Sequence, residues 1–146
     1  MNEAAVSEAA VDSPWFIVAI IAAFFVIFPL FWSAISGLLA GISGWTRLAQ
    51  RYAWQGDMPP SSTTTSGRIG VVNYNNVLEL GQDRSFVYLA VFPIFPFHRT
   101  LRIPRQDVTV SGPARHFFVT YMQLDVKDGP TIRVRAGAWD ETVGRH

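Results

Sequence analysis

The side chains best suited to chemistry are scattered along this chain and do not form a recognised catalytic motif. Its three histidines, His98, His116 and His146, are not spaced as metal ligands are. No serine lies in a nucleophile elbow, and no glycine-rich loop leads from a strand into a helix, where phosphate could bind. The chain has no cysteine, which excludes a thiolate nucleophile, a disulfide framework and a cysteine-based metal centre. We therefore expect a protein that is not an enzyme and that holds no metal or cofactor.

Arginine is the functional side chain present in excess, since the chain has 11 arginines and one lysine. Guanidinium groups bind phosphates and carboxylates through paired hydrogen bonds, so converging arginines would form an anion site. Alternation along residues 131–136 places Arg133 and Arg135 on one face of a strand. The alternative is a solvated sheet face with scattered arginines. The candidate contacts to anions or lipid headgroups are Arg47, Arg51, Arg99, Arg102 and Arg105.

A short apolar stretch, Phe-Pro-Ile-Phe-Pro-Phe at residues 92–97, precedes the arginine-rich segment. Its two prolines exclude a central strand, and the stretch is too short to cross a bilayer. If it is exposed, it forms an apolar contact surface for a membrane or a protein partner. The alternative is a loop that folds back and caps the open end of a barrel. The candidate contact residues are Phe92, Ile94, Phe95 and Phe97.

An uncharged segment without histidine extends from Ser13 to Thr46, and it is almost wholly apolar from Trp15 to Ala40. As a helix, the apolar part would extend about 39 Å, compared with about 30 Å of hydrocarbon in a bilayer. The pattern predicts a transmembrane helix over 14–44, with Pro29 as the kink point. Two alternatives fit less well. A core helix of a soluble protein would show a polar face, which this segment lacks. A cleavable signal peptide would have a basic start and a shorter apolar stretch, whereas this start is acidic.

The charges are distributed unevenly around the predicted helix. Three acids and no base precede residue 47, whereas residues 47–146 hold 12 bases and eight acids. The positive-inside rule then places the acidic tail 1–13 outside and the C-terminal domain in the cytoplasm. The predicted location is the bacterial inner (plasma) membrane, with Trp15 and Trp45 as interfacial aromatic residues.

Small residues recur along the predicted helix with a spacing of four. Such spacing allows two membrane helices to approach closely, so the chain could form a homodimer. The alternative is a glycine-rich exit from the bilayer. The candidate packing residues are Ser33, Gly37 and Gly41.

Three further segments follow the membrane helix. Residues 45–54 have the period of an amphipathic juxtamembrane helix, whose apolar face lies either in the membrane interface or against the next domain. Residues 55–67 are rich in Pro, Ser and Thr and are expected to form a linker. Residues 68–146 form a β-rich domain, because alternating β-branched and aromatic residues dominate them.

Turn residues divide this domain into expected strands. The expected strands are 68–74, 77–80, 85–92, 99–103, 108–110, 116–126 and 131–136, with a turn at Asn75-Asn76, a loop at 111–115 and a terminal helix at 137–143. The predicted fold class is one N-terminal transmembrane helix followed by a small, mainly antiparallel β-domain with a short C-terminal helix.

The chain resembles a group of small, uncharacterised bacterial single-pass membrane proteins. The resemblance covers most of residues 44–110, and the residues that carry it are Gly44-Trp45, Leu48-Ala49, Tyr52, Pro59-Pro60, Gly67, Leu101-Arg-Ile-Pro104 and Asp107-Val108. Members of that group tend to carry a His-Pro-Pro-Leu-x-Ile-Pro-Trp stretch. Here Arg99-Thr100 follow His98, and Arg105 stands at the tryptophan position, so the resemblance assigns no role to this segment.

The order of strands, the Ile-Pro-x-x-Asp-Val step and the terminal helix are also similar to PH- and GRAM-like domains. This similarity implies an open barrel used for lipid or protein binding, and it supplies no catalytic residue. We therefore expect a membrane-anchored interaction module that binds a membrane-protein partner or the lipid surface. The alternative is an accessory or assembly subunit of a larger membrane complex. Nucleic-acid binding is not expected, because the positive excess is modest and no recognition helix is visible.

Overall fold

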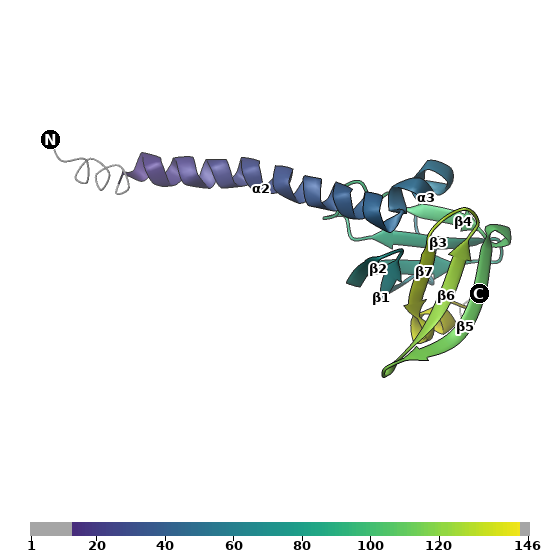
Figure 1. Ribbon diagram of the computed structural model, residues 1–146. Coiled ribbons are helices and arrows are strands. Elements are labelled where there is room, and N and C mark those ends of the chain that lie inside the picture. Colours follow the sequence, from purple (N-terminus) through teal and green to yellow (C-terminus); the bar gives the residue numbers. More distant parts are fainter. Residues whose placement is uncertain (1–12, 144–146) are drawn as a thin grey trace. The chain divides into compact units, whose positions relative to one another are not determined.

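The computed structural model describes residues 13–143 of the chain (Figure 1). The chain divides into two compact units, of which the first ends at Ile35 and the second begins at Ser36. The predicted acidic tail, apart from Ser13, lies outside the described residues, as does His146.

The first helix, α2 (Pro14–Ser43), has 30 residues and contains Pro29. It is the one helix within residues 13–143 that is long and apolar enough to cross a membrane, and its most apolar window has a mean hydropathy of 2.6. No residue of that window is buried. The predicted long apolar helix near the N-terminus is therefore confirmed.

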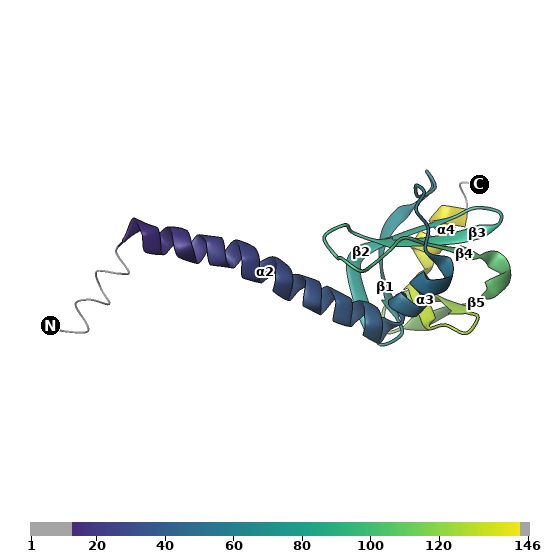
Figure 2. The same ribbon diagram turned by 90° about the horizontal axis from the view of Figure 1, so that it is seen from above.

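The second unit contains an antiparallel sheet of seven strands in the order β4-β3-β2-β1-β7-β6-β5, coiled into a half-barrel (Figures 1 and 2). The predicted antiparallel β-domain is thus confirmed. The strands are β1 (Thr63–Ile69), β2 (Val72–Gln82), β3 (Phe86–Val91), β4 (Leu101–Pro104), β5 (Val108–His116), β6 (Val119–Val126) and β7 (Thr131–Arg135).

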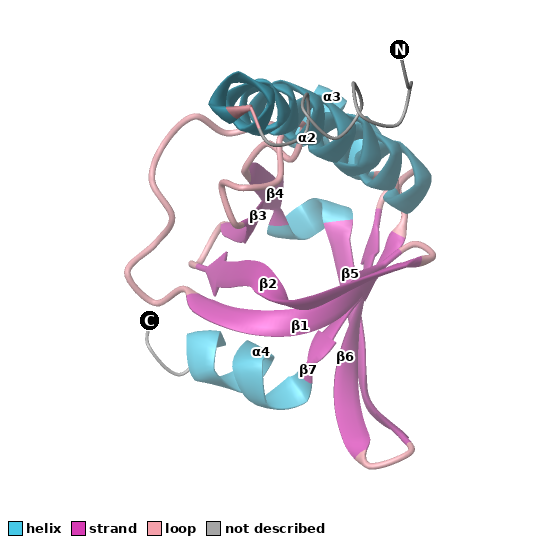
Figure 3. Cartoon of the chain, turned by 90° about the vertical axis from the view of Figure 1, so that its left-hand side faces the viewer, coloured by secondary structure: helices cyan, strands magenta, loops and turns pink. Residues whose placement is uncertain are grey.

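Two short helices complete the core of the half-barrel (Figure 3). The helix α3 (Trp45–Tyr52) buries Trp45, Leu48 and Tyr52, so its apolar face packs on the domain and not in the membrane interface. The predicted terminal helix is α4 (Ala136–Val143), which buries Trp139 and Thr142. The main buried residues of the strands are Ile69, Leu78, Leu80, Val87, Leu89, Leu101, Ile103, Leu124, Ile132 and Val134.

The two edge strands, β4 and β5, are joined by the short 3₁₀ helix η1 (Arg105–Asp107). The segment around α3 bonds to the residue that precedes β4 and to the last residue of η1. The Trp54 amide donates a hydrogen bond to the Thr100 carbonyl over 2.8 Å, and the Tyr52 hydroxyl donates one to Asp107 over 3.0 Å. These bonds tie α3 across the open side of the half-barrel.

The first hairpin differs from the sequence expectation. Strand β1 begins at Thr63, so residues 63–67 belong to the sheet and not to the predicted linker. The chain turns at Gly70, which has a φ of 59°, and not at Asn75-Asn76. Asn76 instead lies within β2, where its amide and side chain bond to Ser66 over 2.8 and 3.0 Å. These bonds accompany a register shift in β1 between Thr65 and Gly67.

The prediction for the hairpin of β5 and β6 was also wrong. The expected loop 111–115 lies within β5, and the expected strand 116–126 is interrupted by a turn at Phe117 and Phe118. Pro113 is tolerated because β5 is an edge strand and the register shifts between Ser111 and Ala114. Phe117 has a φ of 55°, in the left-handed region that phenylalanine rarely adopts, so its residue type does not predict a turn here.

Two glycine substitutions test the packing of the half-barrel. A β-carbon on Gly67 would lie 2.6 Å from the Arg133 carbonyl oxygen and 2.8 Å from Leu78, so Gly67→Ala should lower the free energy of unfolding by about 1–3 kcal/mol. Gly137→Ala, in helix α4 with no atom within 4 Å, should raise it by about 0.5–1 kcal/mol. Denaturant unfolding of the full chain in neutral detergent measures both, and equal effects would contradict the packing described.

Candidate functional site

The C-terminal turns of α2 are bound to the loop that connects β3 to β4. The Ser36 hydroxyl donates a hydrogen bond to the Pro96 carbonyl over 2.5 Å and lies 3.2 Å from Nδ1 of His98. The Phe97 ring lies against Gly37, where an added β-carbon would come within 3.3 Å of the ring. The apolar loop predicted as a contact surface is therefore held beside the helix at Ser36 and Gly37.

The apolar loop divides its side chains between the core and the surface. Phe95 is half-buried and packs against the core, as expected for a loop that folds back on the barrel. The other three candidates are exposed, with exposed fractions of 41% for Phe92, 63% for Ile94 and 64% for Phe97. The loop thus caps the core with one ring and presents three large apolar side chains outside it.

A network of polar and aromatic side chains lies beneath this loop. Nε2 of His98 lies 2.9 Å from the hydroxyl of Tyr74, which in turn donates a hydrogen bond to Ser43 over 3.2 Å. The indole of Trp45 donates to the Arg99 carbonyl over 2.9 Å, and its ring centroid lies 5.3 Å from that of His98. Because Trp45 is fully buried, the prediction that it lies in the membrane interface was wrong.

Burial shifts the pKa values of the two titratable groups in this network. Desolvation lowers the pKa of His98 below its ordinary value of 6.5, although the hydrogen bond to the Pro96 carbonyl acts in the opposite direction. Desolvation raises the pKa of Tyr74, against the effect of its hydrogen bond to Ser43. Neutral forms of both side chains are therefore favoured at pH 7.

Two of the predicted anion-contact residues are engaged within the domain. The Arg102 guanidinium lies over the ring of Trp54 at 3.7 Å and over that of Phe86 at 4.3 Å. Arg105 donates hydrogen bonds to the Asp83 carbonyl over 2.6 Å and to the side-chain oxygen of Gln82. These bonds connect the start of η1 to the end of β2, so Arg105 holds the sheet edge in place.

The other three predicted arginines do not form one cluster. Arg51 donates to the Lys127 carbonyl over 3.0 Å and lies 3.8 Å from Asp128. Arg47 is exposed on α3, and Arg99 is exposed beside Phe97, with which it lines a shallow hollow of about 270 Å³. The structure thus brings one predicted arginine, Arg99, next to the apolar loop.

The small residues of α2 have two different surroundings. Gly37 is covered by Phe97 of the same chain, whereas an added β-carbon on Gly41 would meet no described atom within 4 Å. Ser33 belongs to the first unit. Ser36 and Ala40, in the second small-residue series, are buried against the β-domain. The smallness of Gly37 and Ala40 therefore allows the helix to contact its own domain.

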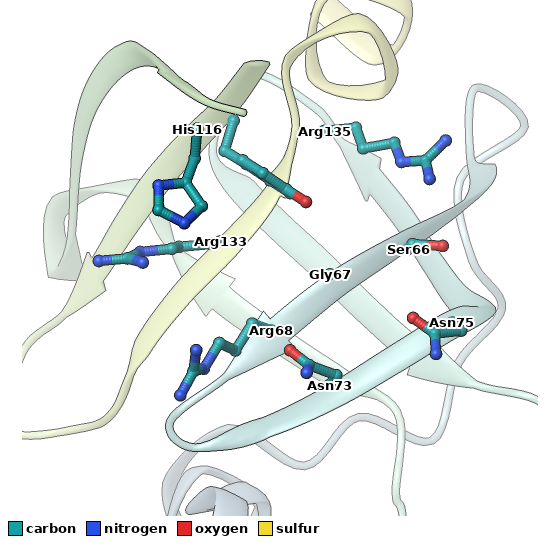
Figure 4. Close-up of a pocket in the computed structure, with 9 residues that line it drawn as sticks. Ser66, Gly67, Arg68, Asn73, Asn75, His116, Arg133 and Arg135 are labelled. Carbon is teal, nitrogen blue, oxygen red and sulfur yellow. The ribbon is translucent and has the colours of Figure 1, made fainter. Parts of the chain in front are cut away.

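A basic surface lies on the outer face of β1 and β7. Arg133 and Arg135 are exposed on one face of β7, as alternation predicted, and Ile132 and Val134 are buried on the other. Arg68 on β1, which the sequence analysis did not single out, is the register partner of Arg133. Figure 4 shows these arginines around a hollow of about 290 Å³.

The network beneath the loop has no local sequence signature, because its members are far apart in the chain. Ser36 and His98 are 62 residues apart, and Ser43 and Tyr74 are 31 apart. The available signal was the pair of serines at Ser36 and Ser43, which lie two helical turns apart on one face of an otherwise apolar segment.

Substitution of Arg105 tests whether this side chain stabilises the fold or instead serves as a membrane contact. Arg105→Gln removes a charged hydrogen bond to buried Gln82, so the free energy of unfolding should fall by about 1–3 kcal/mol. Arg99→Gln is the matched control and should change it by less than about 0.5 kcal/mol. Denaturant unfolding checks both, and equal stability of the two variants would exclude the structural role.

The pH dependence of stability tests the burial of His98. As the pH falls through 6.5, the unfolded chain binds a proton on this imidazole that the folded chain binds only at lower pH. The free energy of unfolding should therefore decrease as the pH falls from about 7.5 to about 5.5. The decrease should be smaller in His98→Gln than in wild type. It should be the same in His116→Gln as in wild type, because the His116 side chain is exposed. An identical pH profile for wild type and His98→Gln would contradict the assignment.

The candidate site therefore has two parts, the apolar loop at the end of α2 and the basic outer face of the sheet. No family model, no curated protein and no solved structure matches this chain.

Proposed function

We propose that the chain is a single-pass membrane protein whose β-domain is a non-catalytic interaction module lying against the bilayer surface. One observation carries this proposal: the exposed apolar side chains of the loop are held beside the last turns of the apolar helix. A loop in that place meets lipid as soon as the helix is inserted.

The length of α2 supports this placement. About 20 apolar residues cross the hydrocarbon core of a bilayer. Counted from Trp15, such a segment ends near Ile35, so Ser36 and Gly37 would lie at the boundary between hydrocarbon and headgroups. Phe97 contacts Gly37, and this boundary is the depth at which interfacial aromatic side chains are stabilised.

The charges near the helix end are compatible with a headgroup contact. Arg99 is exposed beside Phe97, and Arg47 is exposed in the first turns of α3. Each arginine close to an anionic surface contributes on the order of 1 kcal/mol. All 12 basic residues of the chain follow the helix, which favours a cytoplasmic position for the β-domain by the positive-inside rule.

The architecture supports an interaction module of the PH/GRAM-like type suggested by the resemblance. The features that support this proposal are two antiparallel meanders, β1–β4 and β5–β7, that join through β1 and β7, an open side between β4 and β5, and a C-terminal helix that packs into the core. The buried polar groups around His98 are occupied by hydrogen bonds within the domain. This arrangement is more consistent with a fixed scaffold than with a reacting centre.

The chain has no cysteine, so single-cysteine variants allow a direct test. A nitroxide label at Ile94→Cys, in the full chain reconstituted in vesicles of phosphatidylcholine and phosphatidylglycerol, should collide more often with oxygen than with a polar nickel chelate. Oxygen concentrates in lipid and the chelate in water. The matched control is Arg84→Cys, an exposed position in the turn between β2 and β3, which should show the opposite preference.

Equal accessibility of both labels to the nickel chelate would overturn the lipid contact. A label at Ile94→Cys that is shielded from both reagents would also contradict it, because the loop would then be covered by protein. That result would favour a loop packed on a second copy of the chain.

A further inference from the structure

The outer face of the sheet carries two arginines directly opposite each other. Arg68 on β1 is the register partner of Arg133 on β7. The same row continues on both sides with polar side chains, since Asn73 on β2 is opposite Arg68 and Gln123 on β6 is opposite Arg133. The row therefore crosses four strands without an acidic side chain.

Like charges opposite each other destabilise an antiparallel sheet, so this pair needs a compensating partner. Within residues 13–143, Arg68 bonds to the Gly70 carbonyl over 3.2 Å, and Arg133 forms no hydrogen bond or ion pair. The acid near this row is Asp125, whose carboxylate already accepts hydrogen bonds from Gln123 over 3.1 Å and Thr131 over 2.9 Å. Within the described part of the chain, neither arginine of the pair therefore forms an ion pair with an acidic side chain.

The two arginines also lie between two hollows. Figure 4 shows Arg68, Arg133, Asn73 and His116, which line one hollow of about 290 Å³. A second hollow, of about 270 Å³, is lined by Arg68, Arg133 and Gln123. These volumes are at the lower end of small-molecule sites. Arg135 lies at the opposite end of the first hollow and also lines a hollow with Glu141, so it does not belong to the pair.

We propose that Arg68 and Arg133 form a binding site for the phosphate group of a small ligand. Two guanidinium groups present paired donors and two positive charges, which match the nearly two negative charges of a phosphate monoester at pH 7. A diphosphate offers the same oxygen acceptors with a still larger negative charge. A carboxylate would neutralise half of the positive charge of the pair. The Asn73 amide adds an uncharged donor at the edge of the site. This site is separate from the lipid contact proposed above and shares no residue with the apolar loop.

Calorimetric titration of the full chain in neutral detergent with inorganic pyrophosphate tests the site. Wild type should bind, and the affinity should fall as salt is added. Arg68→Gln/Arg133→Gln should weaken binding by about tenfold or more. The control Arg84→Gln/Lys127→Gln removes the same charge from exposed positions elsewhere and should bind within about twofold of wild type.

Thermal unfolding of the same proteins without ligand shows whether the variants fold. Because the substitutions remove a repulsive pair, the double variant should unfold at a temperature no lower than wild type. If it does not fold, Arg133→Lys keeps the charge and loses the planar fork, and it should still weaken binding. Equal binding of pyrophosphate by wild type and the double variant would overturn the proposal, as would the failure of wild type to bind either pyrophosphate or the phosphate lipid described next.

A second titration, with short-chain phosphatidic acid below its micelle concentration, distinguishes the sources of the phosphate. Binding of both probes, each lost in the double variant, supports recognition of the phosphate group itself. Arginine-dependent binding of pyrophosphate alone supports a soluble ligand. Binding of the lipid alone, if it is lost in the double variant, supports a headgroup. Lipid binding that survives in the double variant, without binding of pyrophosphate, would overturn the site.

Discussion

The contact between the last turns of α2 and the β-domain is the interaction on which the rest of the second unit depends. Small residues on one helical face, including Ala40, let the helix approach the sheet closely. Ser36 and Ser43 then place two hydroxyls against His98 and Tyr74, so the polar groups buried by this approach are hydrogen-bonded. An apolar pair at these positions would remove one hydrogen-bond partner each from His98 and Tyr74, which would keep their bond to each other, at a cost of about 0.5–1.5 kcal/mol for each lost bond.

Arginine has several different physical roles in this domain. Arg102 uses its flat face to cover two aromatic rings, and Arg105 uses its fork to join a carbonyl and an amide oxygen. Arg133 does neither within the described residues and faces another arginine. Lysine, a point charge on a flexible stem, would not replace the first two arginines. The composition alone therefore overstates the number of arginines that are available to a ligand.

The sequence predicted those elements whose pattern is local. The helix α2 follows from a continuous apolar segment, and β7 follows from alternation between Ile132 and Arg133. The hairpin of β5 and β6 was missed because Phe117 takes a left-handed conformation that favours other residue types. The first turn was misplaced because Asn76, a common turn residue, is held within β2 by Ser66.

The candidate site was less accessible to sequence analysis than the fold. The apolar loop was found because four large side chains alternate with two prolines. Its position beside Gly37 depends on a contact between residues far apart in the chain. The arginines at 99–105 do not form the expected cluster, because contacts within the domain engage two of the guanidinium groups. Arg102 stacks on an aromatic ring, and Arg105 donates a hydrogen bond to a backbone carbonyl. Arg68 becomes notable only when the register places it opposite Arg133.

The boundary between the two units lies inside α2, and Gly44 is the single residue between α2 and α3. The residues from Ser36 to Ser43 are therefore at once the end of an apolar helix and a part of the packed β-domain. Because Ser36, Ala40 and Ser43 are buried against that domain, a substitution on this helical face alters the packing of the domain as well as the helix itself.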